Sequence, residues 1–86
     1  MIGVIVMMAP VVVALGPAYP CTIAINQVPV AKTAVGPVLR DARRQSANAK
    51  VLFSPETPWR CLGDAITLLS RAGFRHVVYD PPLSPQ

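Results

Sequence analysis

Apolar residues recur at helical spacing in two segments, which predicts helices near residues 34–46 and 58–72. Each segment places four apolar residues on one side: Val35, Val38, Leu39 and Ala42 in the first, and Leu62, Ala65, Ile66 and Leu69 in the second. Thr33 and Thr57 precede these segments, and we expect their hydroxyl groups to cap the two helices. Pro37 and Pro58 fit only in a first helical turn.

Short β-type runs separate the two predicted helices from each other and from the ends of the chain. The predicted strands cover residues 22–25, 28–30, 50–54 and 76–79. Asn26 and Gln27 are expected to turn the chain, and Pro29 confines its strand to a sheet edge. Gly73 is expected to end the second helix in the left-handed conformation, with Phe74 packing back onto the last turn. The pattern predicts an α+β fold with both helices on one face of a small sheet.

The first sixteen residues are almost entirely apolar and allow three interpretations. Their length is at the lower limit for a membrane anchor, since a span needs about 20 apolar residues. A signal peptide is the second interpretation, although no basic residue and no Ala-x-Ala cleavage site accompanies the run. The third is a buried strand from Val4 to Met8 in a globular core. Periodicity does not separate these alternatives.

Composition narrows the functional classes. The chain has 86 residues, of which 52% are hydrophobic and 14% charged, so one small apolar domain is expected. No charged residue occurs before Lys32. This composition excludes a polar disordered chain, and two cysteines are too few for a disulfide-rich scaffold. The net charge of +4 forms no dense basic stripe, so we expect no nucleic-acid partner.

The residues that carry chemistry form no convincing catalytic set. Cys21 and Cys61 are interpreted as two small, buried or half-buried thiols, and a disulfide is expected only if the domain is exported. His76 and Asp80 share one face of the last strand, but such a pair at a strand end is usually solvated. We expect no catalytic, cofactor-binding or metal-binding residue, and no cofactor.

Basic residues gather near the first predicted helix. Arg40, Arg43, Arg44 and Lys50 are expected to lie on the side of the helix opposite its apolar face. A solvated face is the usual role of such a group. The alternative is contact with an acidic partner or an anionic surface.

The stretch from Thr57 to Val78 resembles the C-terminal half of the ExbD/TolR family of biopolymer transport proteins. Trp59 stands where that family usually has Tyr, and Ala72-Gly73-Phe74 matches the end of the family's helix. Val51-Leu52-Phe53 is similar to the preceding strand, and the resemblance extends over about residues 21–80. The similarity implies a non-enzymatic component of an energy-transducing membrane transport complex, linked to the proton-motive force.

The resemblance also implies a domain organisation and partners. Residues 1–20 would form a membrane anchor or signal-like segment, 21–80 a periplasmic domain, and 81–86 a Pro-rich tail. The expected location is the inner membrane, with soluble periplasmic or cytoplasmic forms as alternatives. The expected partner is a multi-span channel subunit of the ExbB/TolQ type, with a homodimer and a periplasmic protein as further candidates.

The chain departs from the family in ways that keep other functions open. The family's membrane helix carries an Asp, whereas residues 1–31 contain no charged side chain, so no residue here takes over the proton-coupled role. The loop from Ser54 to Thr57 is also shorter than usual. The chain is therefore interpreted as a divergent or truncated member. The alternatives are an exported binding module and a cytosolic βαβ domain without a transport role.

Overall fold

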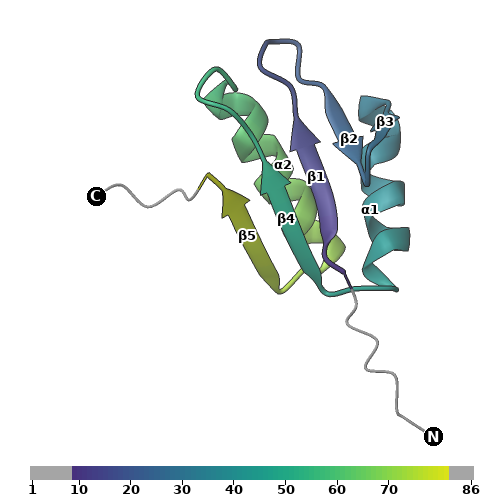
Figure 1. Cartoon of the computed structure of the whole chain (residues 1–86). Helices are drawn as coiled ribbons and strands as arrows, with labels where there is room; N and C mark the ends of the chain where they lie inside the picture. The colour runs from purple at the N-terminus through teal and green to yellow at the C-terminus, as the bar shows by residue number, and fades with distance from the viewer. Residues whose placement is uncertain (1–8, 82–86) are drawn as a thin grey trace, which may run out of the picture.

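The computed structural model describes residues 9–81 and consists of a five-stranded sheet with two helices on one face (Figure 1). The strands are β1 (Val11–Leu15), β2 (Ile23–Ile25), β3 (Val28–Val30), β4 (Asn48–Leu52) and β5 (His76–Asp80). The helices are α1 (Val35–Arg43), which follows a short 3-10 turn at Lys32–Ala34, and α2 (Trp59–Ala72). The α+β fold predicted from the sequence is confirmed.

The strand order is β3-β2-β1-β4-β5. β1 pairs antiparallel with β2, which pairs antiparallel with β3, whereas β1, β4 and β5 run parallel to one another. The carboxyl ends of β1, β4 and β5 therefore lie at the same end of the sheet, at the top of Figure 1. α2 connects the parallel strands β4 and β5 and begins at that same end of the sheet.

The central strand β1 comes from the apolar N-terminal run, where no strand was predicted at these positions. Val11, Val13 and Leu15 face the helices, and Val13 is only 1% exposed. The sheet therefore begins about ten residues before residue 21, where the sequence placed the start of the domain. Residue 21 itself lies in the loop between β1 and β2. The strand expected from Val4 to Met8 falls outside the described residues.

The helical stripes pack against the sheet as predicted. Val35 and Leu39 of α1 are buried, as are Leu62, Ala65 and Leu69 of α2. Both helices contribute to a single cluster with the inward-facing residues of the strands. Gly73 adopts φ 94°, the left-handed conformation expected after the helix, and the buried Phe74 packs into the same cluster. Both predictions for the end of α2 are confirmed.

The hairpin prediction is also confirmed. Asn26 and Gln27 form the turn, and both have positive φ, as a tight turn between antiparallel strands requires. The side chain of Asn26 accepts a hydrogen bond from the Val12 amide at 2.9 Å, so the turn is fixed to β1. Pro29 lies in the edge strand β3, opposite Ala24.

Both helix caps were predicted wrongly. Thr33 lies within the 3-10 turn, and the N-cap residue of α1 is Ala34, which makes no side-chain cap. The N-cap of α2 is Pro58, so the helix begins one residue later than predicted. The first helix also ends at Arg43, before the predicted limit of residue 46. The two caps were predicted from residue type alone. In the structure Thr33 belongs to the 3-10 turn, and the Thr57 hydroxyl forms its hydrogen bonds with Ser54 and Gly16 instead.

Candidate functional site

The candidate site is the group of loops at the carboxyl ends of the parallel strands. The loop of residues 16–22 follows β1, the loop of residues 53–58 follows β4, and Pro81 follows β5. The Phe53 amide donates a hydrogen bond to the Asp80 carbonyl at 3.1 Å, which places the end of β5 beside the second loop. Ligands of open α/β sheets commonly bind beyond the carboxyl ends of the strands. We call these loops and the first turn of α2 the strand-end surface.

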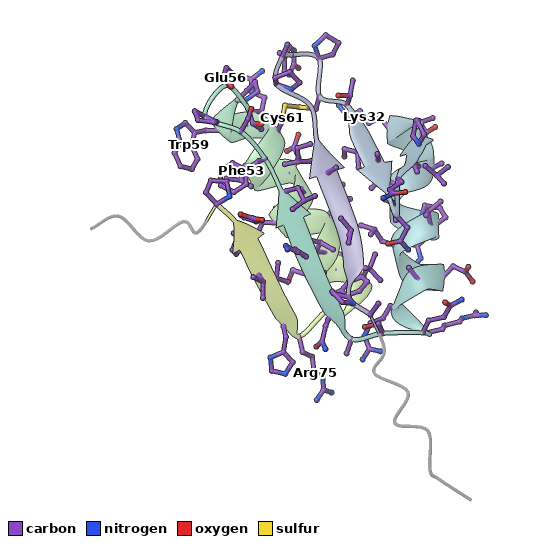
Figure 2. The ribbon with its side chains drawn as sticks, in the orientation of Figure 1. Lys32, Phe53, Glu56, Trp59, Cys61 and Arg75 are labelled. Carbon is purple, nitrogen blue, oxygen red and sulfur yellow. A yellow bond between two sulfur atoms is a disulfide. The ribbon has the colours of Figure 1, made fainter. Side chains whose placement is uncertain are left out.

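A disulfide joins Cys21 to Cys61 across this surface, with a Cα–Cα distance of 5.4 Å. The interpretation of the two cysteines as separate thiols is therefore wrong. Cys21 lies at the end of the β1–β2 loop, two residues before β2, and Cys61 lies in the first turn of α2, so the bond fixes this loop to the helix (Figure 2). Such bonds are characteristic of proteins in oxidising compartments.

Two further contacts hold the loop of residues 16–22, one from the loop of residues 53–58 and one from α2. The Thr57 hydroxyl donates a hydrogen bond to the Gly16 carbonyl at 3.1 Å and accepts one from the Ser54 amide at 3.0 Å. The Arg60 guanidinium carbon lies 5.5 Å from the centroid of the Tyr19 ring, a cation–π contact. The loop after β1 is therefore anchored near its start, in its middle and at its end.

Gly16 is the tightest point of this loop. Its amide donates to the Thr22 carbonyl at 3.0 Å, which closes the loop, and a Cβ atom at this position would collide with the Thr22 hydroxyl. Only glycine fits here without displacing Thr22. The sequence offers the neighbouring Pro17 and Pro20 as turn signals, but not this close approach.

Trp59 is the most exposed large apolar residue of the strand-end surface, with 78% of its area accessible. It lines a pocket of about 90 Å³ together with Phe53, Ser54, Pro55, Thr57 and Leu62. Figure 2 shows Trp59 directed away from the sheet on the side of Phe53. Small-molecule sites usually have about 300–1,000 Å³, so this pocket suits a single side chain of a partner.

On the open face of the sheet, His76 and Asp80 lie on the exposed side of β5, and Asp80 has Lys50 as its partner. Asp80 forms an ion pair with Lys50 of β4, with 3.7 Å between carboxylate and amine. His76 and Asp80 do share the exposed face of β5, as the alternation predicts. No group of three His, Cys, Asp or Glu side chains able to hold a metal ion occurs within residues 9–81.

The predicted basic side does not form a single surface. Arg43 donates from Nε to the Gly73 carbonyl at 2.8 Å and so links the ends of the two helices. Lys50 belongs to β4 and pairs with Asp80 on the sheet. Arg40 and Arg44 line a shallow depression that Asp41 also lines, so the two remaining arginines share this surface with an acidic group.

Comparison with known proteins finds no relative of this chain. No protein-family model, curated protein or solved structure matches the chain. Within residues 9–81, neither helix has both the length and the apolar character that crossing a bilayer requires.

Proposed function

We propose that this chain is a non-enzymatic, disulfide-bonded component of an energy-transducing membrane transport complex, and that its strand-end surface binds a protein partner. The observation that carries the binding role is Trp59, exposed beside a pocket of the size of one side chain. Trp, Tyr and Arg are the residue types that most often dominate protein interfaces. Trp59 lies next to Arg60, which contacts Tyr19.

The anchoring of this surface supports binding by a preformed site. The disulfide and the Arg60 contact connect the loop of residues 16–22 to α2, and the Thr57 hydrogen bond connects it to the loop of residues 53–58, all before any partner arrives. A preformed site loses little conformational entropy when it binds, so more of the contact energy appears as affinity.

The transport role rests on the resemblance to the ExbD/TolR family. Two features on which the resemblance is based are present, namely the strand β4 before α2 and the Ala72-Gly73-Phe74 end of that helix, whereas β1 lies outside the residues that the resemblance covers. The disulfide supports a location outside the reducing cytosol, which also suits the competing function of a free exported binding module. A cleaved product found free in the periplasm would favour that alternative.

Affinity purification from detergent-solubilised membranes tests the proposal. The tagged chain should retain a multi-span membrane subunit, and Trp59→Ala should lose most of it. Val28→Ala serves as the matched control, because Val28 is also well exposed but lies in β3 at the far edge of the sheet. Equal recovery with Trp59→Ala and the unchanged chain would contradict a binding role for this surface. Absence of any membrane subunit from the unchanged chain would contradict the transport role.

A further inference from the structure

The two edges of the sheet differ in how they are protected. At one edge, β3 has three residues, and its central Pro29 has no amide hydrogen to donate. At the other edge, β5 has five residues and no proline, and no strand among residues 9–81 pairs with its outer side. An exposed strand edge is a template for pairing with another chain unless it is blocked.

The backbone of β5 offers two residues to such a partner. The Asp80 carbonyl accepts from the Phe53 amide and therefore points toward β4. Backbone groups alternate between the two sides along a strand, so those of Val77 and Tyr79 point to the outer edge. Val78, between them, directs its side chain to the open face and is 61% exposed.

The sequence of β5 is complementary to itself in the antiparallel direction. In a pairing centred on Val78, each His76 lies opposite Asp80 of a second copy, and each Val77 lies opposite Tyr79. The Val77–Tyr79 pairs are those whose backbone groups face outward, so each exchanges two amide–carbonyl hydrogen bonds. The His76–Asp80 pairs bring a basic and an acidic side chain together at both ends, where Asp80 also pairs with Lys50 of its own copy.

From this edge and its charge complementarity we propose that two copies of the chain pair through β5 around a twofold axis at Val78, joining their sheets into one. This interface is separate from the strand-end surface that carries the proposed function. A closed dimer covers both β5 edges, and the other sheet edge formed by residues 9–81 is β3, where Pro29 has no amide hydrogen to donate, so assembly stops at two copies.

Sedimentation equilibrium of the oxidised chain tests this pairing, with Val78→Lys as the main variant. The unchanged chain should shift with concentration from its monomer mass of 9.2 kDa toward twice that value. Val78→Lys places two amines at the axis, and we expect the dissociation constant to rise about tenfold or more. Val28→Lys is the control, because Val28 is equally exposed at 61% but lies on the other edge strand.

A charge exchange distinguishes this register from any other association. His76→Asp should weaken the dimer, because it places two carboxylates opposite each other at each end. The double variant H76D/D80H restores opposite pairs and should recover the affinity at least in part. Circular dichroism melts of all variants verify that the monomer is folded. A chain that remains monomeric at all concentrations, or Val78→Lys and Val28→Lys with equal dissociation constants, would overturn the proposal.

Discussion

The Thr57 hydroxyl donates a hydrogen bond at 3.1 Å to the carbonyl of Gly16, a residue that precedes it by 41 positions. The same oxygen accepts the Ser54 amide, so one side chain joins the loops after two neighbouring parallel strands. The residue expected to cap α2 thus holds together the strand-end surface. Its role depends on tertiary contacts that helix signals in the sequence do not reveal.

Replacement of Thr57 by Val should lower the free energy of unfolding by about 1–3 kcal/mol, because the Gly16 carbonyl and the Ser54 amide lose a partner. Urea denaturation measures the change. Thr67→Val is the matched control, since the exposed Thr67 hydroxyl donates a hydrogen bond only to the Gly63 carbonyl of its own helix. Equal unfolding free energies for the two variants would mean that the Thr57 contact contributes no stability.

The disulfide should be a major source of stability in a domain this small. Its two cysteines are 40 residues apart, and closing a loop of that length stabilises by about 4 kcal/mol when only the entropy of the unfolded chain is counted. We expect the urea midpoint to fall strongly when dithiothreitol is added. The double variant C21A/C61A should show no response to the reductant. An unchanged midpoint for the reduced native chain would contradict this role.

Replacement of Gly63 and of Gly73 by alanine should change the stability of the fold in opposite directions. Gly73 has φ 94°, so Gly73→Ala should destabilise the fold by about 1 kcal/mol. Gly63 lies on the exposed side of the helix, and an added methyl group there would meet only open space, so Gly63→Ala should stabilise by about 0.5–1 kcal/mol. Thermal melts of both variants measure the shifts. Shifts of the same sign would contradict the assigned end of α2.

A charge in the core stripe should unfold the domain. Leu69 is 1% exposed and packs in the cluster that joins α2 to the sheet, so Leu69→Asp buries a carboxylate that has no partner. We expect its cooperative melt, followed by circular dichroism, to disappear. Ser70→Asp changes the exposed neighbour and should keep the melt. A cooperative melt for Leu69→Asp at the native temperature would show that the core face is assigned wrongly.

Helices and their packing faces were predictable because the information is local. Leu62, Ala65 and Leu69 recur at the helical period, and Gly73 marks the end of α2. β1 was not predictable in the same way, since Val11, Val12 and Val13 continue an apolar run that also precedes them. Val11 and Val13 alternate in burial with Val12 only because α1 and α2 cover one face of the sheet.

The candidate site was harder to predict for the same reason. Without β1 in the sheet, nothing placed the loop of residues 16–22 beside α2, so neither the Cys21–Cys61 bond nor the Thr57–Gly16 contact followed from the sequence. Trp59 stood out only through the resemblance to the ExbD/TolR family. In the structure it is the first residue of α2, which begins one residue later than the cap signal indicated.

The most direct test of the central claim is photo-crosslinking at position 59 in intact cells. A benzophenone amino acid replaces Trp59 in one variant and Val28 in the control, and both positions are exposed. The account predicts a specific adduct from position 59 with a multi-span membrane subunit, identified by mass spectrometry, and none from position 28. An absence of adducts at position 59, or the same adducts at both positions, would contradict a partner-binding role for the strand-end surface.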